Sequence, residues 1–252
     1  MSQYEDFAYI YDELMSDVEY EKWTEFMKDH FNQNDKKIEM IAELGCGTGT
    51  MTTALAHAGY EMIGIDLSEH MLMVAREKAS EEHVDILFLQ QDMTKFELFG
   101  TVDAIIATCD SLNYVNEEEL LKVFKLVENY LNQGGLFIFD LNTEYKFKEI
   151  YHNQTFSEIG EDFAYIWENH YNEKTKTNEY GITFFVEDES EQYTRFDEDH
   201  TEHVHSNEKV KELLKKAKLT FVDTFDDYSD KPHHNQTERI TYIVKNLNEK
   251  QR

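Results

Sequence analysis

Apolar and polar positions follow two different periodic patterns along the chain, and the first pattern extends over residues 38–141. Short apolar runs alternate there with stretches whose apolar residues recur every three or four positions, as in buried strands and amphipathic helices. The clearest helix is predicted over 117–131, with one apolar stripe: Leu120, Val123, Phe124, Val127 and Leu131. Strands that alternate with helices favour a doubly wound parallel sheet. The five strands predicted here cover residues 38–44, 61–66, 84–90, 101–108 and 135–141.

The second periodic pattern extends over residues 156–205, where apolar residues occupy every second position between short polar turns. One stretch shows it well: Tyr180, Ile182, Phe184 and Val186. Period-two alternation of this kind indicates an antiparallel meander. Helical spacing then returns over 210–217, and two last strands are predicted at 219–225 and 240–244.

The chain is therefore predicted to be an α/β protein with an inserted antiparallel β subdomain. The main domain would comprise residues 1–155 and 206–252, and the insert residues 156–205. Because it lies between the fifth strand and the last helix, the insert is expected to cover the carboxyl ends of the parallel strands, where open sheets bind their ligands. Helices within residues 1–32 would form a lid.

A glycine turn joins the first predicted strand to its helix. Gly45, Gly47 and Gly49 stand at alternate positions, and Glu43 precedes them. Glycines are needed where the backbone faces a ligand or adopts a positive φ. The dinucleotide fingerprint has a wider gap before its third glycine, and no Lys-Ser or Lys-Thr pair closes a phosphate loop. Since Glu43 would also repel a pyrophosphate, the predicted ligand is nucleoside-like, free of phosphate and positively charged.

The run Glu43-Leu44-Gly45-Cys46-Gly47-Thr48-Gly49 resembles motif I of the class I S-adenosylmethionine-dependent methyltransferases. The resemblance covers nearly the whole chain and implies a seven-stranded, Rossmann-like methyltransferase sheet. It also implies S-adenosylmethionine as cofactor and S-adenosylhomocysteine as product. Glu43 would hold the cofactor's amino group directly or through the loop. The loop residues that would surround the cofactor are Gly45, Cys46, Gly47 and Gly49. Without the resemblance, the sequence of this run is also compatible with a glycine turn in an α/β protein of another family.

Acidic residues end the next two strands. Asp66 is placed to accept hydrogen bonds from both ribose hydroxyls of a nucleoside, in a methyltransferase or in a dehydrogenase. After the third strand, the resemblance assigns Asp92 to the adenine, although it could instead cap a short turn. Further residues expected in the cofactor site are Leu67, Met71, Gln91 and Met93.

The loop after the fourth strand faces the crevice of the predicted sheet. Asp110 and Tyr114 are its candidate catalytic residues, and Cys109 is expected beside the cofactor. Asp110 would assist an acceptor amine in losing its proton. Side chains from this loop, from the end of the fifth strand and from the insert are assigned to the substrate: Ser111, Asn113, Asn142 and Arg195. Arg195 could alternatively be a surface partner of nearby carboxylates.

The first predicted helix, 4–15, places Tyr4, Phe7, Tyr11 and Leu14 on one face. Taken alone, this face is typical of an amphipathic helix packed on the core. It also fits a lid whose aromatic rings cover the sulfonium of the cofactor, since a cation over a π face is stabilised by up to ~2 kcal/mol. Tyr11 is accordingly expected in the cofactor site and beside the methyl group.

The chain is most similar to the small-molecule enzymes with an antiparallel insert, namely the sugar-amine N,N-dimethyltransferases and, more distantly, glycine N-methyltransferase. In the sugar-amine enzymes an N-terminal tyrosine that matches Tyr11 borders the methyl group. A histidine follows their fourth strand, where this chain has Tyr114, and a tyrosine with a pKa of ~10 is a poor base. The resemblance implies transfer of methyl to a small-molecule acceptor, with an amine favoured, but it does not fix an amino sugar.

The amino-acid composition restricts the classes of partner that are expected. The formal net charge is −28, from 52 acidic and 24 basic residues. Nucleic acids and anionic membranes are bound through Lys and Arg, so neither is an expected partner. Many of the acidic side chains could simply solvate the protein. With no apolar run of membrane-spanning length and no signal-peptide pattern, the cytoplasm is the expected location. The oligomeric state stays open, with a dimer as one option.

No metal site and no disulfide are predicted. His200, Glu202, His203 and His205 are close in sequence, but on a strand residues 203 and 205 share one face while 200 faces the other way. The two cysteines fall in loops assigned to the ligand site, which does not suggest a disulfide framework. Two other functions stay open, a nicotinamide-dependent oxidoreductase and a non-catalytic adaptor that binds the cofactor.

Overall fold

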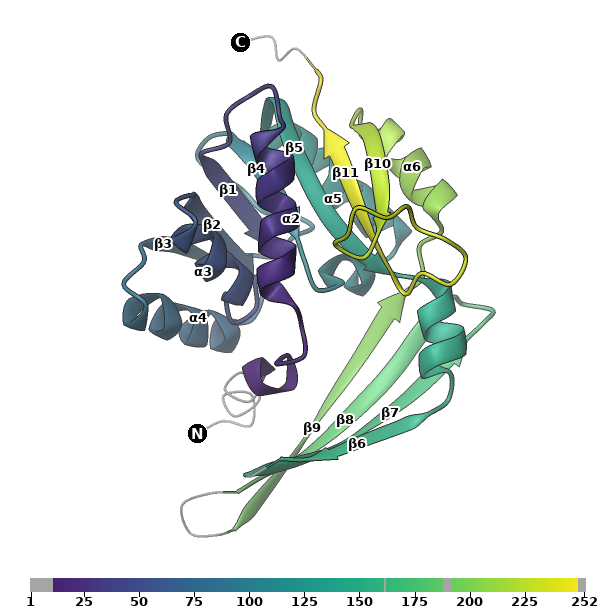
Figure 1. Ribbon diagram of the computed structural model, residues 1–252. Helices are drawn as coiled ribbons and strands as arrows, with labels where there is room; N and C mark the ends of the chain where they lie inside the picture. The colour runs from purple at the N-terminus through teal and green to yellow at the C-terminus, as the bar shows by residue number, and fades with distance from the viewer. Residues whose placement is uncertain (1–10, 161, 188–191, 249–252) are drawn as a thin grey trace.

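The computed structural model describes residues 11–160, 162–187 and 192–248, and it contains two sheets (Figure 1). The larger sheet has seven strands in the order β10-β11-β5-β4-β1-β2-β3. In the run β5-β4-β1-β2-β3 all neighbouring strands are parallel. β11 is antiparallel to both of its neighbours, β5 and β10. The strands are β1 Met40–Leu44, β2 Glu61–Asp66, β3 Ile86–Gln90, β4 Val102–Ala107, β5 Leu131–Asn142, β10 Thr220–Asp226 and β11 Arg239–Lys245.

Helices cover both faces of this sheet because its central strands are apolar on both sides. Ile105 and Phe137 pack on the face that α5 and α6 cover, while Ile106 and Ile138 pack on the face that α2 and α3 cover. A smaller cluster joins α4 to β3. The helices are α2 Tyr20–Asn32, α3 Thr50–His57, α4 Glu69–Glu81, α5 Glu117–Tyr130 and α6 Asn207–Lys216. This arrangement confirms the predicted doubly wound α/β fold.

The smaller sheet is the predicted meander. Its four strands pair in sequence order and all are antiparallel. They are β6 Thr155–Ile159, β7 Phe163–Asn172, β8 Thr177–Glu187 and β9 Tyr193–His203. In Figure 1 this sheet extends away from the seven-stranded sheet, beyond the end of β5. The inserted antiparallel sheet is thus confirmed as part of the fold, while the exact domain boundaries stay a prediction.

Two details differ from the predicted elements. β5 begins at Leu131, directly after α5, instead of at Gly135; the extra residues are absorbed where its pairing with β4 shifts register, next to Gly134 at φ 79°. A short stretch of π-helix, η2 Lys146–Tyr151, follows β5 and was not predicted. Of the helix predicted over 4–15, residues 4–10 lie outside the described part of the chain, and Met15 N donates to Tyr11 O at 3.0 Å as in a helix.

Candidate active site

A cavity of about 810 Å³ lies between the carboxyl ends of the parallel strands and the inner face of β7, β8 and β9. The loops after β1 to β5 line one side, and the segment from Tyr11 to Val18 lines part of its border. Arg239, the first residue of β11, also reaches it. This volume falls in the range of small-molecule sites.

The glycine loop presents backbone to the cavity. Gly45, Gly47 and Gly49 have φ values of 67°, 52° and 75°, which favour glycine. A Cβ on Gly45 would stand 2.7 Å from the Cβ of Ser111, so this turn has no room for a side chain. Gly45 and Gly47 line the cavity, whereas Cys46 and Gly49 are not among its described lining residues. Those two shape the loop from behind.

Asp66 ties the glycine loop to the end of β2. Its Oδ2 accepts a hydrogen bond from Gly47 N and its Oδ1 one from Ser68 N, both at 2.8 Å. Burial raises the pKa of Asp66, although these backbone donors oppose the rise. The predicted residues Leu67 and Met71 line the cavity beside it.

Asp92 both lines the cavity and caps a turn, so its two predicted positions are compatible with each other. It lines the cavity together with Gln91 and Met93, and its Oδ1 caps a turn by accepting from Thr94 N at 2.8 Å. Burial alone would raise the pKa of Asp92, but the bonds from Thr94 and Lys95 lower it. The carboxylate is therefore ionised and fixed at the cavity wall.

Glu43 stands behind the glycine loop. Only 1% of it is exposed, and its carboxylate accepts hydrogen bonds from the hydroxyls of Thr52 and of Thr108, the latter at 2.8 Å. Burial raises its pKa to about 7, against the effect of both hydroxyls. Because Glu43 is not among the described lining residues, this position is compatible with action through the loop and not with direct contact.

The N-terminal segment is anchored over the glycine loop by an aspartate that the sequence did not single out. Asp12 Oδ2 lies 2.6 Å from Lys78 Nζ, and its Oδ1 accepts from Thr50 Oγ1 at 3.1 Å. The neighbouring Tyr11 lines the cavity, and its ring would be 3.9 Å from a Cβ on Gly47. Tyr11 therefore borders the cavity beside the glycine loop, and its role in a lid stays a prediction.

The far end of the cavity holds a buried ion-pair cluster. Arg239 Nη2 lies 2.8 Å from Asp110 Oδ1, and Nη1 of the same side chain bonds Asp140. Asp140 also accepts from Tyr228 Oη at 2.6 Å and from the backbone N of Asp110 at 2.8 Å. Burial alone would raise the pKa of Asp110, but Arg239 and Lys146 lower it below its ordinary value. Asp110 is therefore an ionised, paired carboxylate.

Glu202 of β9 meets this cluster from the insert. Its side chain is hydrogen-bonded to Asp110, and Asn142 Nδ2 approaches its Oε1 at 3.4 Å. Burial and the adjacent Asp110 raise the pKa of Glu202 well above its usual value. Glu202 thus keeps its proton and donates it in the bond to Asp110. Lys146 of η2 completes the group, with Nζ 3.1 Å from Asn142 Oδ1.

Aromatic rings form the wall between these ends. Tyr114 Oη is 2.5 Å from Tyr180 Oη, which links the loop after β4 to the insert. His200 stacks on Tyr180 with ring centroids 4.8 Å apart and meets Tyr114 edge-on at 5.8 Å. Further rings that line the cavity are Tyr151, Tyr165, Trp167 and Phe184.

Two of the residues assigned to the substrate lie elsewhere. Asn113 is fully buried, and its Nδ2 donates to the backbone oxygen of His203 at 2.9 Å, so it joins the loop to β9. The side chain of Arg195 is 60% exposed and pairs with Asp197 at 2.8 Å. The assignment of Arg195 to the substrate was therefore wrong, and its alternative as a surface partner of carboxylates holds. Ser111, Asn142 and Cys109 do line the cavity.

The sequence did not point to Arg239, Lys146 and Tyr180 as site residues, and it considered His200 and Glu202 only as metal ligands. A signal existed for the insert: Glu198, His200 and Glu202 alternate along β9 and all line the cavity. For Arg239 no local signal exists, because its partners Asp110 and Asp140 are 129 and 99 residues away.

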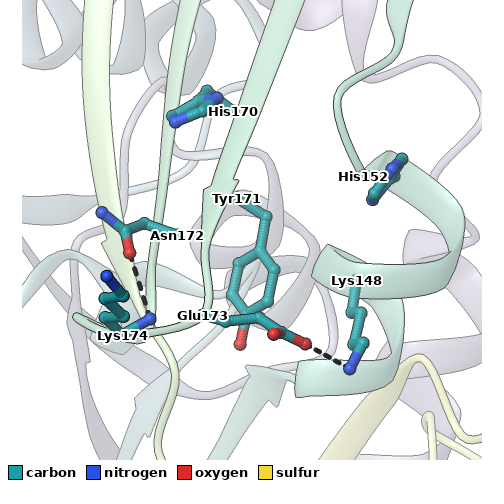
Figure 2. A pocket seen from close by; sticks show the side chains of 7 residues that line it. All are labelled: Lys148, His152, His170, Tyr171, Asn172, Glu173 and Lys174. Atoms are coloured by element: carbon teal, nitrogen blue, oxygen red, sulfur yellow. Dashed lines mark hydrogen bonds and ion pairs between the residues drawn. The ribbon is translucent and has the colours of Figure 1, made fainter.

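A second hollow, of about 510 Å³, opens between η2 and the turn after β7, and Figure 2 shows its side chains. Lys148 and Glu173 point toward one another there and form an ion pair, while His152 and His170 lie apart. This hollow has the features of a solvated surface. Within the described ranges, no group of three His, Cys, Asp or Glu side chains could hold a metal, and no helix is long and apolar enough to cross a membrane.

Comparison with known proteins decides the family. A family model described as a methyltransferase domain matches residues 41–135. A Geobacillus sp. protein named as a methyltransferase is 34% identical over 96% of this chain and 99% of its own. The methyltransferase-named YqeM of Bacillus subtilis is 36% identical over 95% of each chain. The chain belongs to the class I S-adenosylmethionine-dependent methyltransferases.

Solved structures agree with this assignment. An S-adenosylmethionine-dependent methyltransferase from Clostridium acetobutylicum is 36% identical and superposes with a TM-score of 0.88, covering 97% of this methyltransferase and 99% of that chain. CalS10 from Micromonospora echinaspora, an amino pentose methyltransferase solved with S-adenosylmethionine bound, shares the fold at 15% identity, with a TM-score of 0.71 and coverage of 94% and 96%.

S-adenosylmethionine is therefore the cofactor of this enzyme, and family membership replaces the two alternatives, an oxidoreductase and an adaptor. The cavity fits such a group. The backbone of Gly45 and Gly47 faces the cavity, at a turn where Ser111 leaves no room for a side chain on Gly45, and the carboxylates of Asp66 and Asp92 line the same space. A positively charged, phosphate-free nucleoside suits carboxylate acceptors of this kind.

Proposed function

We propose that this methyltransferase transfers a methyl group to the nitrogen of a small-molecule amine. The observation that carries the proposal is the composition of the acceptor end, where tyrosine and tryptophan rings line the same cavity as the ionised Asp110. An ammonium group is attracted to aromatic faces, by about 2 kcal/mol or more when desolvated, and to carboxylates. A neutral alcohol or thiol gains neither interaction to the same degree.

The cofactor end would hold S-adenosylmethionine through residues named above. Gly45 and Gly47 would offer backbone, Asp66 would accept from the ribose, and Asp92 would face the adenine. Tyr11, anchored through Asp12, would cover the methyl-bearing end. The cofactor supplies a methyl carbon bonded to a positively charged sulfur, which is an excellent leaving group.

With such a leaving group, the chain's own task is to orient the acceptor and exclude water. Orientation alone can lower a barrier by about 7–11 kcal/mol. The insert contributes to both, because Tyr165, Trp167 and Tyr180 lie on its inner face. Its bond from Tyr180 to Tyr114 fixes the insert against the loop after β4.

Asp110 is better suited to binding than to proton removal. A carboxylate whose pKa lies below its ordinary value, and which already pairs with Arg239, is a weak base at neutral pH. We assign it to attracting and aligning the amine. This replaces the base role that the sequence had suggested.

A small acceptor is favoured by the cavity itself. Its volume of about 810 Å³ must hold the cofactor as well, and the insert closes one side. The net charge of −28 disfavours nucleic acid and anionic membrane partners. CalS10, whose fold this chain shares, acts on an amino pentose, which is consistent with an amine but does not fix a sugar.

Matched acceptors test the proposal. Benzylamine, benzyl alcohol and benzyl mercaptan differ only in the reacting atom, and glucosamine with glucose gives a second pair. We expect release of S-adenosylhomocysteine and an N-methyl product, identified by mass spectrometry, with amines only. Turnover of the alcohols or thiols at equal or higher kcat/KM would contradict the proposal. So would the absence of turnover with every amine while S-adenosylhomocysteine binds normally.

A further inference from the structure

An amine acceptor raises a problem of proton transfer that the site must solve. An alkylamine is protonated at neutral pH and then has no lone pair with which to attack a methyl group. A group at the acceptor end that takes this proton would make the abundant protonated form of the amine reactive. This inference rests on the proposed function, amine methylation.

Most titratable groups of the cavity are unsuited to that task. Asp110 is paired with Arg239, and Glu202 already holds its proton in the bond to Asp110. Burial raises the pKa of Cys109 to about 12, and it raises the pKa values of Tyr114 and Tyr180 well above the usual value, so these groups also hold their protons.

His200 differs from them in chemistry and in position. It lines the cavity from β9, between Glu198 and Glu202, and its ring lies against both Tyr180 and Tyr114. Burial lowers the pKa of His200, and the neighbouring Asp199 only partly opposes this. Its imidazole is consequently neutral near pH 7 and can accept a proton.

The titratable and charged groups around His200 come from several elements. Tyr114 approaches from the loop after β4 and Tyr180 from β8. Asp110, Lys146 and Arg239 line the same cavity from the loop after β4, from η2 and from β11, and β9 itself adds Glu198, Asp199 and Glu202. Asp110, which stays ionised beside the protonated Glu202, and the aromatic faces of Tyr114 and Tyr180 can hold a cationic amine in the region that His200 faces.

We propose that His200 is the catalytic residue that accepts the proton of the acceptor amine. The ammonium N–H proton passes to a ring nitrogen of His200, which leaves a neutral amine with a free lone pair. That lone pair forms the N–C bond as the C–S bond of the cofactor breaks, with the electron pair staying on sulfur. The imidazolium then returns its proton to solvent.

The proton-transfer role has a test based on two acceptors. Benzylamine is an ammonium ion at neutral pH, whereas aniline is already neutral and needs no base before attack. We expect His200→Asn to lower kcat/KM for benzylamine by about 100-fold or more at neutral pH, and to leave that for aniline nearly unchanged. In the variant, the benzylamine rate should also rise about tenfold per pH unit, since the free amine then becomes the reactant.

A spectroscopic measurement tests the same role without turnover. In side-chain ¹H–¹⁵N spectra of the labelled wild-type protein, the His200 signals are identified by their loss in His200→Asn. We expect them to report a neutral ring at neutral pH and a pKa below about 6.5. The control is His170→Asn, a histidine of the same sheet that lines the exposed hollow of Figure 2, and it should keep wild-type kinetics.

Each contrary outcome has a distinct meaning. Equal losses for benzylamine and aniline in a folded His200→Asn variant, or a protonated His200 at neutral pH, would overturn the role of His200 and leave amine methylation standing. The same holds if Lys146→Met, and not His200→Asn, lowers kcat/KM for benzylamine at neutral pH while leaving that for aniline unchanged. Failure of the wild type with every amine would instead overturn the proposed function.

Discussion

The two ends of the cavity are built in different ways. At the cofactor end, backbone groups and short loops do most of the positioning: Asp66 accepts from Gly47 N and Ser68 N, which are 19 and 2 residues away in the sequence. At the acceptor end, side chains from distant segments meet: Asp110 with Arg239, and Tyr114 with Tyr180. The first end belongs to the parallel sheet, and the second depends on how the insert and β11 come together over it.

Because of this difference, the two ends of the cavity tolerate different changes in sequence. A loop held by local backbone bonds keeps its shape whatever acceptor the enzyme uses, which suits a cofactor common to the family. A cluster of side chains from distant segments can differ between enzymes without any change in the cofactor loop, which suits a variable acceptor. The cost is that the acceptor end contains buried charges whose partners cannot be removed singly without a large penalty.

The largest expected effect tests that penalty. Arg239→Met leaves Asp110 and Asp140 buried without their cation, so we expect the free energy of unfolding to fall by about 3–5 kcal/mol. Urea denaturation measures it. Arg195→Met is the matched control, because its exposed pair with Asp197 should contribute only about 0–1 kcal/mol. Equal effects of the two variants would contradict the description of a buried cluster.

The next effect concerns the cofactor end. Asp66→Ala removes the acceptor of two backbone hydrogen bonds, so we expect the affinity for S-adenosylhomocysteine to fall about 100-fold, or about 3 kcal/mol. Asp66→Asn retains one acceptor oxygen and should lose less. Calorimetric titration gives both values. Unchanged affinity in a folded Asp66→Ala protein would show that this end does not depend on the carboxylate.

A somewhat smaller effect depends on pH and arises at Glu43, where the cofactor end does rely on a buried side chain. Its pKa is about 7 in the folded protein and about 4.3 in an unfolded chain. Between these values the folded state holds a proton that the unfolded state lacks. That contribution to stability is present at low pH and is lost as the pH rises through 7.

Glu43→Gln isolates this contribution. The difference in unfolding free energy between wild type and variant should shift by about 2–3 kcal/mol between about pH 5 and pH 8, to the disadvantage of the wild type at the higher pH. Urea denaturation across this range measures it, and Glu61→Gln, an exposed residue of β2, is the control. A difference that is constant with pH would mean that Glu43 is ionised throughout.

The contrast between the two ends also explains how much the sequence could predict. The fold followed from periodicity: β2 has the predicted bounds, and the α5 stripe of Leu120, Val123, Phe124 and Val127 is buried. The glycine loop and Asp66 were found because their spacing is local. The early start of β5 was missed because the register shift near Gly134 leaves no trace in the hydrophobic pattern.

The acceptor end was predicted only in part, for a physical reason. Asp110 and Tyr114 were found because they lie in the loop that directly follows a parallel strand. Their partners, however, come from η2, β8, β9 and β11. A lysine or arginine near a strand end gives no indication of which buried carboxylate it will meet. Asn113 shows the converse, since a polar residue in the right loop turned out to bond the backbone of β5 and β9.

The smallest effect tests whether the two ends act independently. Tyr180→Phe removes the 2.5 Å bond to Tyr114, and we expect a loss of about 0.5–1.5 kcal/mol in the free energy of unfolding. Because the bond joins the insert to the loop after β4, KM for benzylamine should rise while the affinity for S-adenosylhomocysteine stays the same. Tyr193→Phe, whose hydroxyl bonds Glu187 on the exposed side of the insert, controls for loss of a tyrosine hydroxyl. If Tyr180→Phe weakened cofactor binding as much as it weakened acceptor binding, the insert would have to hold both ligands, and the separation into a local cofactor end and a long-range acceptor end would fail.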